Sequence, residues 1–343
     1  MAEMLTSGKL AVRVVTCLAV LGMVMCLCAV VGTQKISLQK VLAGPGEVPG
    51  ENIDYEIFVG VRLPRVILAA LVGAALACSG VVLQAILRNP LADPYILGIS
   101  SGAGLGVIIA ILSGISWTFL GGSPIGVFAF AGALGTVWLV WYIGRFTGKS
   151  QVTSLLLAGV VINTFFSAVI MFLTSIAKSE QLRSTIYWLM GSITEKDWLT
   201  LWISGVCILG GIIGLFSICH RLNALTLGDN EAQGLGVDTA KTKMAAFGFA
   251  AFITAIAVSL SGLIGFVGLI IPHGVRLVFG PDHRQLLPVS AIIGSAFLVC
   301  ADTLARTIFG QEQLPVGVIT AIVGGPFFLV LLAKYSRKVS WLK

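Results

Sequence analysis

Charged residues are scarce in this sequence of 343 residues, where aspartate, glutamate, lysine and arginine together make up 11%. Soluble globular domains carry about 25% charge, which keeps them dissolved. Hydrophobic residues account for 57% and are spread along the whole chain, so the shortage of charge is not confined to one segment. The composition therefore excludes a soluble domain and indicates an integral membrane protein whose solvent is the lipid bilayer.

The sequence also lacks the motifs that carry catalysis or bind metals. It has no HExxH or CxxC, and its three histidines stand far apart. Residues 144–150 resemble a phosphate-binding loop, but the spacing between the glycines is one residue short and Ile143 stands where the first glycine should be. We interpret them as a short basic cytoplasmic loop. We therefore expect no catalytic residue, cofactor or metal site, and any ATP hydrolysis must come from another chain.

The net charge of +7 raises the question of a nucleic-acid partner. The basic residues are scattered among apolar runs, and no basic patch with interleaved aromatic residues occurs. We expect no nucleic-acid partner. An excess of cationic loops on the cytoplasmic side of a membrane explains the charge better.

Apolar segments of membrane-spanning length recur along the chain. A helix needs about 20 apolar residues to cross roughly 30 Å of hydrocarbon. Only helices satisfy their own backbone in lipid, so the sequence predicts an all-α, polytopic fold of about ten transmembrane helices. The candidate spans are residues 11–32, 65–87, 95–113, 123–144, 152–176, 199–219, 244–264, 266–279, 286–305 and 315–334.

The distribution of basic residues predicts the topology. With a cytoplasmic N-terminus and ten crossings, 14 of the 22 lysines and arginines lie inside and 8 outside, as expected for short loops. The segment 266–279 is short enough to be re-entrant, but the basic tail at 334–343 would then end outside. We therefore predict ten crossings with both termini cytoplasmic. The apolar run 14–31 suits a retained helix better than the short core of a signal peptide.

Few polar groups fall within the predicted spans. Asn163 and Thr164 lie near the middle of the fifth span, where they either bond to a neighbouring helix or line a solute pathway. Asp302 and Arg306 stand four residues apart near the outer end of the ninth span and can pair on one helical face. Mid-span Asp or Glu is missing, which argues against a secondary transporter coupled to protons or sodium ions.

Five stretches carry a resemblance to one family. They are RLPR (62–65) with LVGAALACSGVVLQAILRNPLADPYILGISSGAG (71–104), QLRSTIYWLMGS (181–192), LGDNEAQGLGVD (227–238), SGLIGFVGLIIPHGVRLVFGPDHRQLLPVSAIIGSAFLVCADTLAR (261–306) and QLPVGVITAIVGGPFF (313–328). Together they resemble the FecCD family, the membrane permeases of ABC importers for iron–siderophore complexes, haem and cobalamin. The similarity runs from about residue 55 to 334.

The resemblance implies an ABC type II importer permease fold. Residues 1–343 would form a single transmembrane permease domain, with a cytoplasmic coupling loop at 220–243. It also implies a homodimer in the bacterial cytoplasmic membrane, two ATP-binding cassette ATPase subunits below it and one extracytoplasmic substrate-binding protein above it. We expect an iron(III)–siderophore as cargo, with cobalamin or haem as alternatives. An ion-coupled secondary transporter is the alternative of a different class.

The resemblance also implies site residues, by matching positions in the family's motifs. Arginines of the RLPR and ADxxAR motifs bind carboxylates of the binding protein in this family, which implies docking roles for Arg62, Arg65 and Arg306. Charged contacts of this kind steer and orient docking.

Two further groups of residues are implied on the cytoplasmic side. The coupling pattern that contacts the ATPase is matched by Leu227, Gly228, Asp229, Ala232, Leu235 and Gly236. The family's cytoplasmic gate is matched by Asn89, Leu91, Thr153 and Ser154. No family motif singles out Asn163, which we add as a pathway residue for its position within the fifth span.

Overall fold

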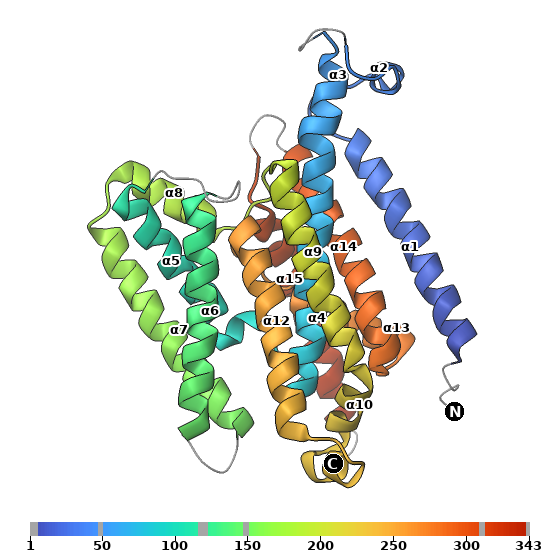
Figure 1. Cartoon of the computed structure of the whole chain (residues 1–343), viewed down its shortest axis with the longest axis vertical. Coiled ribbons are helices and arrows are strands. Elements are labelled where there is room, and N and C mark those ends of the chain that lie inside the picture. Colours follow the sequence, from blue (N-terminus) through green and yellow to red (C-terminus); the bar gives the residue numbers. More distant parts are fainter. Residues whose placement is uncertain (1–5, 47–50, 116–122, 147–150, 309–312, 341–343) are drawn as a thin grey trace.

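The protein forms a helical bundle in this computed structural model, which describes residues 6–46, 51–115, 123–146, 151–308 and 313–340 (Figure 1). These residues contain no strand. Ten apolar helices follow the ten predicted spans in order, which confirms the all-α polytopic fold. They are α1 (Ser7–Val30), α4 (Leu63–Ile86), α5 (Ile99–Ser113), α6 (Pro124–Phe146), α7 (Gln151–Ser175), α9 (Trp198–Ser217), α12 (Thr239–Ser261), α13 (Val267–Phe279), α14 (His283–Thr307) and α15 (Val316–Ser340).

The ten helices differ in length. Seven are long and apolar enough to cross a membrane, whereas α5, α13 and the apolar part of α15 described as Val316–Val330 are shorter. With 13 residues, α13 is about 20 Å long at ~1.5 Å per residue, less than the ~30 Å of a hydrocarbon core. The predicted segment 266–279 is therefore a short helix that follows a non-helical stretch at 262–266, and not a full-length spanning helix.

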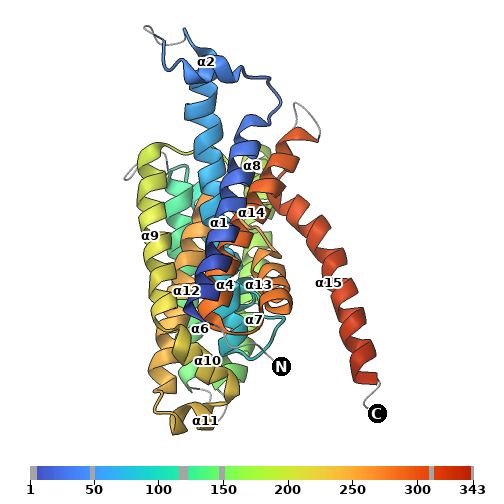
Figure 2. The same ribbon diagram turned by 90° about the vertical axis from the view of Figure 1, so that its right-hand side faces the viewer.

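Short helices lie at the two ends of the bundle. Figure 1 shows α2 and α3 at one end, above α4, and Figure 2 shows α10 and α11 at the opposite end, where α1 begins and α15 ends. The predicted basic loop at 144–150 lies outside the described residues from 147 onward. The short elements are α2 (Leu38–Leu42), α3 (Ile53–Glu56), η1 (Ile57–Arg62), η2 (Pro94–Leu97), α8 (Ser179–Leu189), α10 (Cys219–Leu227) and α11 (Asp229–Gly234).

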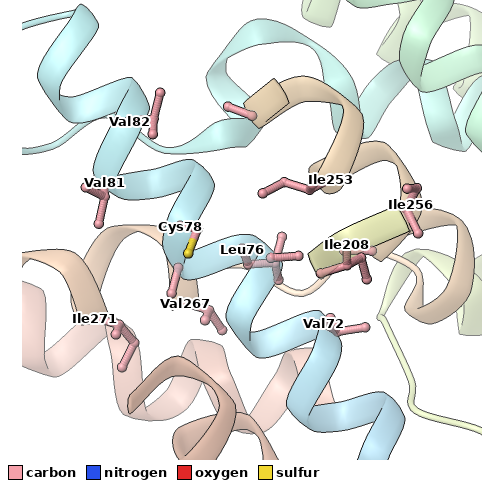
Figure 3. Close-up of a cluster of buried hydrophobic side chains, with 14 of the residues drawn as sticks. Val72, Leu76, Cys78, Val81, Val82, Ile208, Ile253, Ile256, Val267 and Ile271 are labelled. Atoms are coloured by element: carbon pink, nitrogen blue, oxygen red, sulfur yellow. The ribbon is translucent and has the colours of Figure 1, made fainter. Parts of the chain in front are cut away.

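The core is built around α4, which is the most deeply buried of the seven long spans. Figure 3 shows apolar side chains of α4 meeting Ile208 of α9, Ile253 of α12 and Val267 of α13. Glycine allows this close approach: a Cβ atom added to Gly80 would stand 1.8 Å from the carbonyl oxygen of Gly268. Small residues thus bring α4 and α13 into backbone contact. In lipid the hydrophobic effect does not drive helices together, so this close packing stabilises their contact instead.

Candidate docking and coupling sites

A buried ion pair joins the start of α4 to the end of α14. Arg65 Nε donates to both carboxylate oxygens of Asp302 at 3.1 Å, and Arg65 Nη2 donates to Oδ1 at 2.9 Å. Arg65 Nη1 donates to Gln313 Oε1 at 2.8 Å. This forked geometry satisfies the carboxylate with charge-assisted hydrogen bonds, so neither charge is buried without a partner.

Arg306 lies on the other side of the same carboxylate. Its Nε stands 3.8 Å from Asp302 Oδ2 and makes no hydrogen bond to a described residue, while Nη2 donates to the Cys28 carbonyl and the Thr303 hydroxyl. The sequence spacing predicted a pair between Asp302 and Arg306. That contact exists, but the main partner of Asp302 is Arg65, because the Arg65 guanidinium faces the carboxylate across the helix interface.

Arg62 completes a cluster of three arginines at the end that carries α2 and α3. Its guanidinium donates to the carbonyl oxygens of Ala29, Val30 and Gln34, at and just beyond the end of α1. A Cβ atom on Gly32 would stand 2.8 Å from this guanidinium, so the chain after α1 wraps closely around it. Arg62 therefore anchors α1 through neutral acceptors alone among the described residues.

Burial of the arginine cluster was not anticipated. The exposed fractions of Arg62, Arg65 and Arg306 are 4%, 5% and 6% in this structure, although a docking role requires contact with a partner. Their position agrees with the predicted topology, since they lie at the end opposite to α10 and α11 (Figure 1). Their role in docking stays a prediction.

Asp229 organises the segment between α10 and α12. Its carboxylate binds the Arg88 guanidinium and accepts a 2.7 Å hydrogen bond from Lys243 Nζ, while Arg88 Nε donates to the Leu225 carbonyl at 3.2 Å. Gly228 precedes it with φ +143°, a conformation that favours glycine. These contacts fix α11 to the loop after α4 and to the second turn of α12.

The other predicted coupling residues divide into buried and exposed groups. Ala232 is fully buried, whereas Leu227 and Leu235 are each 66% exposed. Gly236 is exposed and has φ +80°. Ala232 is packed inside and anchors the segment, while Leu227 and Leu235 expose large apolar side chains to solvent. Such an exposed apolar surface is typical of a site that a partner covers. We call Leu227 and Leu235 the apolar knob.

The predicted gate residues come from two parts of the fold, the loop after α4 and the helix α7. Asn89 Oδ1 accepts a hydrogen bond from the Leu91 backbone N–H at 2.9 Å, which shapes the loop after α4. Ser154 is buried in the first turns of α7, Thr153 precedes it, and Asn163 is half-buried further along α7. The described residues contain no hydrogen bond between the loop and α7. The element that packs against α7 is η2, which follows the loop: a Cβ atom on Gly159 would stand 2.7 Å from the Ile96 carbonyl oxygen.

Two polar residues that the sequence analysis did not single out support the broken backbone before α13. The Tyr95 hydroxyl donates to the Ile264 carbonyl and accepts from the Ile264 N–H, both at 2.9 Å. Gln84 Nε2 lies 3.4 Å from the carbonyl oxygens of Gly268 and Leu269. Irregular backbone at membrane depth must be satisfied within the protein. The helix-breaking residues Pro94 and Gly98 lie on either side of Tyr95 and indicate an irregular segment. Nothing in the sequence identifies Ile264 as the partner of Tyr95.

The fold and these sites define a class of protein, a multi-pass helical membrane protein with a core of apolar helices. The arginine cluster lies at one end of its bundle, and the segment around Asp229 lies at the other. Comparison with known proteins identifies the family. Residues 18–334 match the FecCD transport family, and the chain belongs to it.

Relatives and a solved structure support this membership. The chain is 46% identical to the cobalamin import system permease protein BtuC of Halobacterium salinarum, over 81% of this chain and 73% of the relative. It is 43% identical to the hemin transport system permease protein HmuU of Yersinia pestis, over 83% and 86%. A structure described as an inward-facing ABC transporter of metal-chelate type matches with TM-score 0.80 and 35% identity, over 92% of this chain and 97% of that chain. The relatives are permease subunits of importers, and the predicted importer permease fold is confirmed.

Proposed function

We propose that this chain is the permease subunit of a binding-protein-dependent ABC importer that carries a metal chelate across the bacterial cytoplasmic membrane. The proposal rests on one observation: in this chain of the FecCD family, two candidate sites lie at opposite ends of the helical bundle. A cluster of arginines lies at one end of the bundle, and the apolar knob beside Asp229 lies at the other. An importer needs a receptor for cargo delivery at one end and a contact for its motor at the other.

The coupling role is assigned to residues 220–243. Leu227 and Leu235 would insert into a cleft of a separate ATPase subunit, and Asp229 would transmit its movement to the membrane helices through Arg88 and Lys243. Gly228, Ala232 and Gly236 would shape the turns and packing of the same segment. A rigid element with exposed apolar anchors suits the transfer of force to a groove on a soluble partner.

The docking role is assigned to the arginine cluster. Arg65 and Arg306 share one carboxylate, Asp302. Arg62 lies near Arg306 with Asp54 as its charged neighbour, so three arginines are matched by two carboxylates and the cluster holds an excess of positive charge. Among the residues that the structure describes, Arg62 donates hydrogen bonds to backbone carbonyls alone. A carboxylate of a substrate-binding protein would form stronger, charge-assisted bonds with Arg62 than these neutral acceptors do. Docking would therefore displace the chain after α1 from Arg62 and open the cluster.

The pathway is assigned to the interface of a homodimer. Asn89 and Leu91 with Thr153 and Ser154 would close its cytoplasmic end, and Asn163 would line it within the membrane. Both termini would face the cytoplasm, together with α10 and α11. ATP binding and hydrolysis in the partner subunits would switch the pair between outward- and inward-facing states.

The cargo is assigned to the class of metal chelates. Two relatives of this chain are permeases of a cobalamin import system and of a hemin transport system. These two cargoes and an iron(III)–siderophore, the cargo expected from the sequence, are the candidates to be compared. The binding protein sets selectivity in such systems, so its bound ligand identifies the cargo directly.

Uptake by reconstituted vesicles tests the proposal. The chain is co-reconstituted with the ATPase and the substrate-binding protein proposed as its partners. Uptake of cobalamin, haem and an iron(III)–siderophore is measured with ATP, without ATP and with an imposed proton or sodium gradient. We expect uptake of one chelate that requires ATP and the binding protein. Gradient-driven uptake by the chain alone would contradict the proposal and support the secondary transporter.

A further inference from the structure

A cavity of about 560 Å³ opens between three helices at the end that carries α2 and α3. Its walls come from the start of α6, the start of α9 and the end of α12, and its mouth includes Lys196 in the loop before α9. None of the predicted docking, coupling or gate residues lines it. The cavity is therefore separate from the sites described above.

The floor of the cavity lies at the depth of hydrocarbon. Phe130 is six residues from the start of α6, Cys207 nine from the start of α9 and Phe252 nine from the end of α12. At ~1.5 Å per residue these positions lie roughly 9–14 Å in from the helix ends. Half of a ~30 Å hydrocarbon core is ~15 Å, so the cavity occupies one leaflet. Phe130 and Phe252 meet edge to face with ring centroids 6.2 Å apart and close the floor.

The walls offer little to a water-soluble ligand. The Ser204 hydroxyl donates to the Thr200 carbonyl at 2.6 Å, and the Ser259 hydroxyl donates to the Ile256 carbonyl at 2.8 Å. The Thr200 hydroxyl donates to Asp197 at 2.6 Å. These polar groups are already satisfied by their own helices, and apart from Ser123 and the charged residues 195–197 at the mouth the remaining surface is apolar. A hydrocarbon chain fits such a cavity better than water or a polar solute.

The mouth carries an unpaired cation. Lys196 is half-buried and makes neither a hydrogen bond nor an ion pair with any residue that the structure describes. Burial lowers the pKa of its amine, and the neighbouring carboxylates Glu195 and Asp197 offset this only in part. A half-buried ammonium at the level of lipid headgroups needs an anionic acceptor, and a phosphodiester supplies one.

We propose that this cavity binds one phospholipid of the adjacent leaflet, with an acyl chain between α6, α9 and α12 and its phosphate on Lys196. Ile203 of α9 lines the cavity and is 40% exposed, so the lipid around the bundle can reach the opening. Glu195 stands next to Lys196 and favours a headgroup that carries its own ammonium. Phosphatidylethanolamine is therefore preferred over phosphatidylglycerol.

Photo-crosslinking in vesicles tests this site. The full chain is reconstituted in phosphatidylcholine with a trace of phosphatidylethanolamine or phosphatidylglycerol that bears a photoreactive group within an acyl chain, and labelled peptides are mapped by mass spectrometry. We expect labelling of residues 126–130, 203–207 and 252–260, stronger with phosphatidylethanolamine. Lys196→Ala should lower the yield about fivefold, as expected for one lysine near the membrane surface. Cys207→Phe should abolish labelling by filling the cavity.

The matched control is Lys178→Ala, which removes an exposed lysine at the same end and should leave labelling unchanged. Circular dichroism and size-exclusion chromatography verify that each variant is folded, and Ile203→Trp replaces Cys207→Phe if that variant fails. Labelling spread evenly over the lipid-facing side of α9 and insensitive to Lys196→Ala would overturn the proposal. A preference for phosphatidylglycerol would overturn the headgroup assignment. Neither outcome bears on the importer function.

Discussion

At the scale of single residues, the arginine cluster shows how a membrane protein holds charge in its interior. Arg65 and Asp302 sit 5% and 1% exposed and satisfy each other through three hydrogen bonds. Such a pair adds little net stability compared with well-packed apolar residues, but breaking it leaves one uncompensated buried charge. The pair therefore fixes α4 against α14 and makes either substitution costly.

Asp302→Ala should destabilise the protein strongly. It leaves Arg65 buried without its carboxylate, a change that costs about 3–5 kcal/mol. The measurement is the free energy of unfolding of the detergent-solubilised protein in a denaturant titration. Lys241→Ala is the control, since it removes one partner of the exposed pair with Asp238 and should cost less than about 1 kcal/mol. Equal effects of the two substitutions would contradict the buried pair.

Arg62→Gln should weaken docking of the binding protein. It removes the arginine whose hydrogen-bond acceptors among the described residues are all neutral carbonyls. Truncation of one member of a desolvated charge pair lowers affinity by roughly 30-fold or more. The measurement is the affinity of the binding protein for the reconstituted permease. Lys35→Gln changes an exposed charge at the same end and serves as control. Unchanged affinity with Arg62→Gln and Arg306→Gln, both folded, would refute the docking assignment.

At the scale of elements, α10 and α11 combine a rigid base with an exposed tip. Ala232 packs inside and Asp229 binds two cations, while the apolar knob remains exposed. A short helix cannot be stable on its own, so the contacts of Asp229 with Arg88 and Lys243 hold α11 in place. This construction suits a segment that transmits motion.

Leu227→Ser and Leu235→Ser should each weaken assembly with the ATPase. A fully buried leucine contributes about 1.5–3 kcal/mol, which corresponds to a loss of affinity of about tenfold or more. The measurement is ATPase binding to the detergent-solubilised permease, together with substrate-stimulated ATP hydrolysis. Leu42→Ser removes a leucine that is 86% exposed at the opposite end and should change neither. Undiminished binding after both knob substitutions would exclude this surface as the ATPase contact.

At the scale of the whole molecule, the bundle separates two surfaces by the thickness of a membrane. α2 and α3 lie at one end, and α10 and α11 lie at the other with the start of α1 and the end of α15 (Figures 1 and 2). This arrangement requires an even number of crossings. It also means that a signal between the two ends must pass through the membrane helices.

Cysteine labelling in intact cells should report this topology. Lys35→Cys is predicted to react with a membrane-impermeant maleimide from outside, and Asn230→Cys only after permeabilisation, since both positions are exposed at opposite ends. The unsubstituted chain, with its seven cysteines in apolar segments, gives the background. Reaction of both substituted positions from the same side would contradict ten crossings.

The sequence by itself determined the membrane class, the ten helices and the family. Their signals are local: apolar length fixes each span, and the family motifs are contiguous stretches such as 261–306. The predicted boundaries follow the observed helices closely because hydrophobic thickness sets them. The predicted segment 266–279 matches α13 to within one residue, whereas the predicted span 244–264 runs past the end of α12 into the non-helical stretch at 262–266.

The tertiary structure alone decided which distant residues meet. Spacing along one helix suggested Asp302 with Arg306, yet Arg65 lies 237 positions away in sequence and makes the closer contacts. The same holds for Tyr95 with Ile264, for Asp229 with Arg88, and for the cavity at Lys196. Periodicity reports which face of a helix a residue occupies, but only the packing of one helix on another determines what that face contacts.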